Sequence, residues 1–204
     1  GLAALDGNTL AEELFFQFET PRPRVVREEP GNGADRELPT RAFELFFNQR
    51  VSPEKVAQAA SMVLEAGGQS RPLEFTVTRP ESNDPKLVRV TPKEKLPLAA
   101  RVRLTLSGDL LGDEGPASMG QPYHTEFAVY GPLQFARGDL CADYDGRCSP
   151  SGGTSIRFTN PVKIKDALKA LRFDPPLPEP LRAYDEDYVS EFVYVAQELE
   201  PNTK

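Results

Sequence analysis

Residues 40–51 read Thr-Arg-Ala-Phe-Glu-Leu-Phe-Phe-Asn-Gln-Arg-Val, and residues 154–162 read Thr-Ser-Ile-Arg-Phe-Thr-Asn-Pro-Val. The two stretches lie about 110 residues apart, and aligning them places Phe47 on Phe158 and Val51 on Val162. A repeat of this period, built on strands, is typical of tandem modules of one family.

The residues around each copy predict short strands and one short helix. Ser52 followed by Pro53 is a typical helix start, so residues 53–60 are expected to be helical, and residues 164–171 take the same place in the second copy. Residues 31–36 are expected to form a polar loop. The apolar pattern predicts strands at residues 42–47, 62–65, 74–78, 87–91, 101–107, 124–129, 155–158 and 191–195. The chain is therefore predicted to be all-β.

Proline-rich breaks divide the chain into three parts. Tyr130-Gly131-Pro132 marks the main boundary, so residues 21–131 are predicted to be a complete module and residues 132–204 the N-terminal part of a further module. Residues 1–20 are expected to be the terminal strand of a preceding module. We expect residues 14–18 to pair with residues 132–204, within one chain or from a neighbour, because an incomplete sandwich exposes an open sheet edge.

Composition excludes several classes of function. Hydrophobic residues make up 39% of the chain and charged residues 27%, and no apolar run approaches the roughly 18 residues that a membrane span needs. The net charge of -7 and the interleaving of basic with acidic residues argue against nucleic acid as a partner. The 20 prolines and 15 glycines favour many turns between short strands.

Four short motifs resemble the bacterial Ig-like domain family found in S-layer proteins and in the N-terminal region of bacterial alpha-2-macroglobulin. They are Phe-Glu-Thr-Pro at residues 18–21, Phe-Asn-Gln-Arg-Val at 47–51, Phe-Thr-Asn-Pro-Val at 158–162 and Glu-Pro-Asn-Thr at 200–203. The resemblance implies tandem Ig-like β-sandwich modules, each with one short helix. Residues 133–148, with their Cys-x6-Cys loop, and residues 156–162 look most like the alpha-2-macroglobulins of Gram-negative bacteria.

Those proteins trap proteases through a bait region and a thioester that uses a Cys-x-Glu-Gln motif. Neither Cys141, in Cys-Ala-Asp-Tyr, nor Cys148, in Cys-Ser-Pro-Ser, matches that motif. The resemblance therefore implies a non-catalytic scaffold or spacer in a periplasmic or extracellular protein, with membrane anchoring through a missing N-terminus as one option. Its partners would be other domains of the same polypeptide and, through the full-length protein, proteases.

An adhesion or carbohydrate-binding module of an S-layer-like or secreted protein is the main alternative. Such a module would favour exposed aromatic side chains, and the chain has no tryptophan.

Cys141 and Cys148 lie seven positions apart in a polar loop rich in Asp and Gly. A zinc site would need two further ligands, and the only histidine, His124, is isolated. A nucleophilic cysteine would need an adjacent base, which nothing supplies. We therefore expect a disulfide in an exported protein, with no metal and no cofactor.

The acidic residues Asp139, Asp143 and Asp145 leave a nonstandard calcium site open. Cys141 stands where an EF-hand loop would begin and Gly152 where its final Glu belongs, so the EF-hand motif itself fails. The acidic run at residues 185–187 is expected to be a solvated loop. These acids predict no defined metal site.

No catalytic residue is predicted. The chain has no Gly-x-Ser-x-Gly motif, and His124 near the start of its strand has no partner in the sequence pattern, so it is expected to be a surface or edge histidine.

Overall fold

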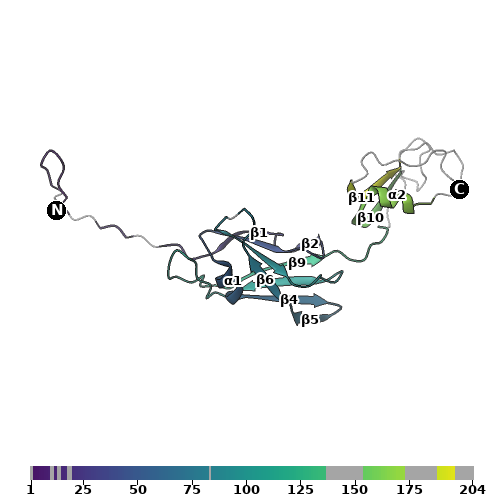
Figure 1. The fold of residues 1–204 in the computed structure, drawn as a ribbon, viewed down its shortest axis with the longest axis horizontal. Helices are drawn as coiled ribbons and strands as arrows, with labels where there is room; N and C mark the ends of the chain where they lie inside the picture. Colours follow the sequence, from purple (N-terminus) through teal and green to yellow (C-terminus); the bar gives the residue numbers. More distant parts are fainter. Residues whose placement is uncertain are drawn as a thin grey trace, which may run out of the picture.

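The computed structural model describes residues 2–9, 12, 15–17, 20–82, 84–136, 154–172 and 188–195 (Figure 1). The elements in chain order are β1 (Val25–Glu29), β2 (Ala34–Glu37), β3 (Phe43–Phe47), α1 (Pro53–Ala59), β4 (Ala60–Ala66), β5 (Gln69–Pro72), β6 (Phe75–Thr78), β7 (Leu87–Pro92), β8 (Arg101–Leu106), β9 (Tyr123–Val129), β10 (Thr154–Lys163), α2 (Ile164–Ala170) and β11 (Val189–Val195). No helix in the described part of the chain is long and apolar enough to cross a bilayer.

Strands β1 to β9 form two facing sheets, which together with α1 we call the central sandwich. One sheet has the order β1-β3-β7-β6 and the other β2-β9-β8-β4-β5. Except for β2, every neighbouring pair in these sheets is antiparallel. This mostly antiparallel, two-layer arrangement confirms the mainly β fold that the sequence predicts.

The core of the central sandwich is organised around β3. Phe43, Leu45 and Phe47 alternate along the strand and are each at most 2% exposed. The Phe43 ring lies 4.8 Å, centroid to centroid, from the ring of Phe127 in the opposite sheet. Aromatic and branched side chains on this period fill the space between two sheets, as the alternation predicts.

The helix α1 lies where the sequence places it. Pro53 occupies its first turn, and Val56 is its buried residue. At Ala60 the backbone becomes extended, and the chain enters β4 without a loop. The helix is therefore a short crossing element between the two sheets.

The expectation of a polar loop at residues 31–36 is wrong, because β2 begins at Ala34. This strand runs parallel to β9, with Ala34 opposite Phe127 and Glu37 opposite Val129. The Gly33 amide donates to the Glu126 carbonyl at 2.8 Å. Pairing across the fold, and not local hydrophobic periodicity, makes this segment a strand.

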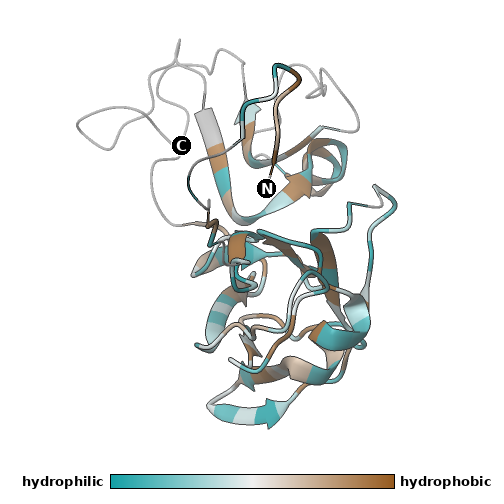
Figure 2. Cartoon of the chain, turned by 90° about the vertical axis from the view of Figure 1, so that its left-hand side faces the viewer, coloured by the Kyte–Doolittle hydropathy of each residue, from teal (hydrophilic) through white to brown (hydrophobic). Residues whose placement is uncertain are grey.

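Strand β5 also lies outside the predicted elements. Gly67 and Gly68 have φ angles of 57° and 77°, the left-handed values that a tight hairpin turn requires, and β5 pairs back on β4. All four residues of β5 are exposed, and the strand is hydrophilic along its length (Figure 2). An edge strand without a buried face has no alternation of apolar and polar residues, so the sequence pattern does not predict it.

Residues 133–136, β10, α2 and β11 form what we call the C-terminal unit. Strands β10 and β11 are antiparallel, and Ile156, Ala167 and Val193 form a small core. Strand β10 extends to Lys163, five residues beyond the predicted end, and leads directly into α2. The predicted order of strand, helix and strand is present.

Residues 15–17 are not part of a strand, and the Phe15 and Phe16 side chains are 86% and 83% exposed. Residues 2–9 lie at one end of the molecule, and β10, α2 and β11 lie at the other (Figure 1). The described part of residues 14–18 therefore makes no pairing with the C-terminal unit of its own chain. Pairing with a neighbouring chain stays a prediction.

Phe46 points away from the core, as its place between Leu45 and Phe47 predicts. The guanidinium carbon of Arg27 lies 3.7 Å from the centroid of the Phe46 ring. The ring is therefore partly covered from within the same sheet.

Replacing Phe47 with Ala should destabilise the central sandwich by about 3–5 kcal/mol, because a fully buried aromatic side chain leaves a cavity. Phe46→Ala on the outer face of the same strand is the matched control and should cost clearly less. Denaturant unfolding monitored by circular dichroism measures both. Equal losses for the two variants would contradict the assignment of the strand faces.

Candidate functional site

Several of the site residues considered from the sequence lie outside the described residues. They are the expected disulfide partners Cys141 and Cys148 and the acids Asp139, Asp143 and Asp145. The acidic run at residues 185–187 lies outside them too. In the described ranges, no three His, Cys, Asp or Glu side chains gather in a way that could hold a metal ion.

His124 is exposed on the outer face of β9, as expected for a surface histidine. Its Nδ1 lies 3.0 Å from the Thr105 Oγ1 on β8. The nearby carboxylate of Glu126 is held by Arg103, whose Nε and Nη2 lie 3.0 and 2.9 Å from its Oε2, and by Arg101. Hydrogen bonding from Arg103 lowers the pKa of Glu126, so this carboxyl stays ionised and is a poor proton acceptor at neutral pH. The arrangement is a charged sheet surface.

In the described part of the chain, Tyr123 is the residue whose pKa is strongly shifted. Burial, and then the negative charge of Glu28, raises the pKa of Tyr123 well above its usual value. Its hydroxyl therefore remains protonated at neutral pH. The neighbouring Thr125 side chain is 1% exposed. The hydroxyl oxygens of Tyr123 and Thr125 are buried, although the Tyr123 side chain as a whole is half-buried.

The most developed polar arrangement lies where the chain enters the central sandwich. The Asn48 side chain, directly after β3, accepts a hydrogen bond from the Arg24 amide at 2.9 Å and donates to the Arg22 carbonyl at 3.0 Å. The next residue, Gln49, is 4% exposed and donates from Nε2 to the Pro21 carbonyl at 2.8 Å. Two consecutive amide side chains thus bind three backbone groups of the incoming segment, and we call this arrangement the linker clamp.

The same contacts occur a second time where the chain enters the C-terminal unit. Thr159 Oγ1 accepts from the Gln134 amide at 2.9 Å and lies 3.2 Å from the Pro132 carbonyl, to which it can donate. Asn160 donates from Nδ2 to the Gly131 carbonyl at 2.8 Å. Two consecutive polar side chains, here within β10, again bind the backbone of the incoming segment.

The strand register beside the two clamps also corresponds. Val25 lies opposite Phe47, and Phe135 lies opposite Phe158. The equivalence of Phe47 and Phe158 that the sequence repeat predicts therefore holds in the pairing of the backbone, whereas in burial the two differ, since Phe47 is buried and Phe158 half-buried. The motifs Phe-Asn-Gln and Phe-Thr-Asn are the sequence signal of the clamp, although composition alone does not reveal what their polar residues bind.

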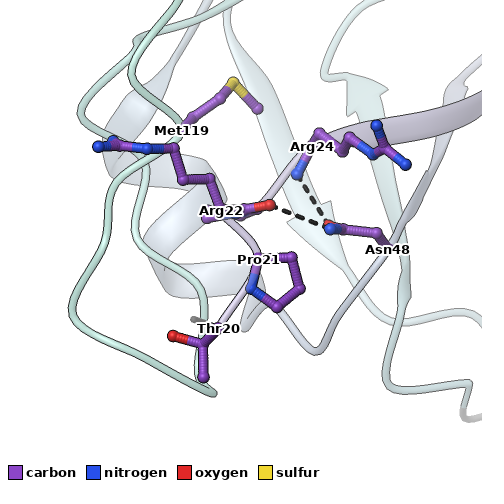
Figure 3. A pocket seen from close by; sticks show the side chains of 7 residues that line it. Thr20, Pro21, Arg22, Arg24, Asn48 and Met119 are labelled. Carbon is purple, nitrogen blue, oxygen red and sulfur yellow. Dashed lines mark hydrogen bonds between the residues drawn. The ribbon is translucent and has the colours of Figure 1, made fainter. Parts of the chain in front are cut away.

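A surface hollow of 470 Å³ lies beside the linker clamp of the central sandwich. It is lined by Thr20, Pro21, Arg22, Pro23, Arg24, Asn48 and Met119 (Figure 3). The guanidinium of Arg22 reaches across to donate to the Ser118 carbonyl at 3.0 Å. The hollow has a mixed apolar and cationic lining and no nucleophile or acid–base pair.

Gly112 packs directly against the Gln49 side chain of the linker clamp. A Cβ atom on Gly112 would lie 2.6 Å from Gln49 Oε1, so Gly112→Ala should displace the Gln49 side chain and break its bond to Pro21. We expect a loss of about 1–3 kcal/mol in the free energy of unfolding. Gly31→Ala, whose Cβ would meet nothing within 4 Å, should stay within about 0.5 kcal/mol of the wild type. A Gly112→Ala variant as stable as Gly31→Ala would show that the clamp adds nothing.

Solved structures with low sequence identity match parts of the chain. CopC from Methylosinus trichosporium OB3b is 13% identical, with 54% of this chain and 96% of that chain covered and a TM-score of 0.38. Domains 1–6 of the surface layer protein SbsC are 20% identical, with 66% and 20% covered and a TM-score of 0.39. The LD transpeptidase LdtMt1 in complex with imipenem is 14% identical, with 68% and 50% covered and a TM-score of 0.37. This chain thus spans half or less of the latter two.

A search of curated proteins gives no match. The family model described as "Bacterial Ig-like domain" matches residues 19–129, which is more than half of the 204 residues. The matched range spans the two sheets of the central sandwich and its linker clamp. The chain therefore belongs to the bacterial Ig-like domain family.

Proposed function

We propose that this chain is a non-catalytic spacer segment built from consecutive Ig-like modules, residues 21–131 and residues 132–204. Residues 1–20 belong, in this proposal, to a preceding module. The role of such a segment is to hold other domains of the same polypeptide at a set distance.

The recurrence of the linker clamp carries this proposal. Asn48 and Gln49 bind the backbone of residues 21–24, and Thr159 and Asn160 bind residues 131–134 in the same way. A contact between a strand end and the incoming linker fixes how a module follows its predecessor. The linker clamp recurs at the start of residues 21–131 and of residues 132–204, which supports an arrangement of similar modules one after another along the chain.

The chemistry of the described surface supports a non-catalytic role. His124 contacts a threonine hydroxyl, and the acid nearest to it in sequence, Glu126, is paired with two arginines. A general base needs a free acceptor within reach of a substrate. The polar groups near His124 are engaged with one another.

The parent protein is proposed to be an exported, alpha-2-macroglobulin-like protease inhibitor, acting in the periplasm or outside the cell. The support is the Cys-x6-Cys opening of the second module together with residues 156–162, which resemble that family. The coding sequence of the whole gene tests this directly. A Cys-x-Glu-Gln motif is expected in it, and a complete gene without that motif would refute this parentage.

Two independent modules should unfold separately. Phe158→Ala should lower the stability of residues 132–204 and leave the central sandwich unchanged, and Phe47→Ala should do the reverse, because distant sites without shared partners act additively. Amide hydrogen exchange read by NMR measures both parts in one sample. A Phe158→Ala variant that weakens both parts equally would contradict a modular arrangement.

The non-catalytic assignment predicts no turnover of peptide, ester or glycoside substrates by the purified chain. His124→Ala is the matched variant, since it removes the single histidine. Reproducible hydrolysis by the wild type that is lost in this variant would overturn the assignment.

Cys141 and Cys148 are expected to be joined when the chain is produced in an oxidising compartment. Alkylation under non-reducing conditions, followed by mass spectrometry, should find neither thiol free in periplasmic material and both free after reduction. Two alkylatable thiols in unreduced periplasmic material would remove the disulfide from the proposal.

A further inference from the structure

An ion pair joins the central sandwich to the C-terminal unit. Arg36 on β2 directs Nη1 to both carboxylate oxygens of Glu191 on β11, at 2.8 and 3.0 Å, although the residues are 155 positions apart. The Glu191 side chain is only 16% exposed, and Arg157 Nη2 approaches it to 4.0 Å. Burial raises the pKa of Tyr130, at the start of the linker, and the negative charge of the nearby Glu191 raises it further.

Comparing β11 with the corresponding strand of the central sandwich shows whether an acid recurs at the position of Glu191. Strand β11 corresponds to β7, since each pairs antiparallel with the strand that carries the aligned phenylalanine of the repeat, Phe158 in β10 or Phe47 in β3. Val193 lies opposite Ile156, as Val88 lies opposite Leu45. Ile156 and Leu45 are each two residues before the aligned phenylalanines of the repeat.

Counting two residues back from Val193 and Val88 gives Glu191 and Lys86. Lys86 is exposed, lies one residue before the start of β7 and has the opposite charge. The central sandwich thus has no acid at the corresponding position. In the C-terminal unit Arg157 approaches Glu191 to 4.0 Å, whereas Arg36 of the central sandwich contacts it at 2.8 and 3.0 Å.

The backbone at Arg36 gives a further indication. Its φ angle is 59°, in the left-handed region that glycine or asparagine normally occupies, because a Cβ atom there comes close to the following carbonyl oxygen. Arg36 thus has an unfavourable backbone conformation, and its side chain is the one that contacts Glu191 in the C-terminal unit. Ala99 has a similar φ angle of 58°, so the backbone adds to the argument only together with the Arg36–Glu191 contact.

We infer that the Arg36–Glu191 ion pair sets the orientation between the two modules, so that the spacer has a preferred angle at the contact between them. We call this contact the joint. This inference rests on the proposed function, in which the C-terminal unit is a module of its own. The Arg36 side chain is 49% exposed, so the pair is weakened by salt and its reversal should reduce the population of the observed orientation by up to about fivefold.

Residual dipolar couplings of the whole ¹⁵N-labelled chain test the inference. Arg36→Glu and Glu191→Arg should each lower the couplings of the C-terminal unit relative to those of the central sandwich. The double variant with both changes should restore them, because the charges are exchanged. Raising the salt concentration to about 0.5 M should make the wild type resemble the single variants.

Two further variants separate charge from other effects. Arg89→Glu reverses a pair of similar exposure, Arg89 with Glu44, inside the central sandwich and should leave the orientation unchanged. Arg36→Gly relieves the left-handed backbone but removes the side chain, and should loosen the joint as much as Arg36→Glu does.

The inference would be overturned if Arg36→Glu kept the residual dipolar couplings of the wild type. It would also be overturned if the double variant kept the lowered couplings of the single variants. The amide chemical shifts of the C-terminal unit report its fold regardless of orientation. Collapsed shifts for that unit in the wild type would therefore refute the proposed modular function, whereas intact shifts with an unchanged orientation in Arg36→Glu would refute the joint alone.

Discussion

The burial of one face of β3 is the constraint on which the central sandwich depends. Phe43, Leu45 and Phe47 are inaccessible to solvent or nearly so, and β1 and β7 pair with the strand on either side. Because side chains alternate with a period of two, a slip of one residue would expose all three. The register is therefore strongly specified. The position of Asn48 and Gln49, directly after the strand, follows from it.

The contacts at the ends of the central sandwich and the C-terminal unit differ in kind from those inside them. The interior is held by apolar packing, whereas the linker clamps use amide and hydroxyl side chains on linker backbone, and the contact between the units is an ion pair. Polar contacts have fixed directions, so they can define an angle without a large buried area. This division suits the spacer role proposed above.

The charged groups of the sheet surface neutralise one another locally. Glu126 binds two arginines, and Glu44 binds Arg89 across neighbouring strands. Cross-strand ion pairs of this kind add modestly to sheet stability. They hold the carboxylates of Glu126 and Glu44 against arginines, which agrees with a structural role for this surface.

The sequence by itself determined the repeat, the strand and helix of each copy and the equivalence of Phe47 with Phe158, because alternation, capping and turn residues act between near neighbours. Only the tertiary structure decided that residues 34–37 become a strand, that Gln49 binds the incoming backbone, and that Arg36 meets Glu191. The chain has 24 basic and 31 acidic residues, so its composition offers many possible pairs. Which of them form depends on which surfaces the folded backbone brings within hydrogen-bond distance.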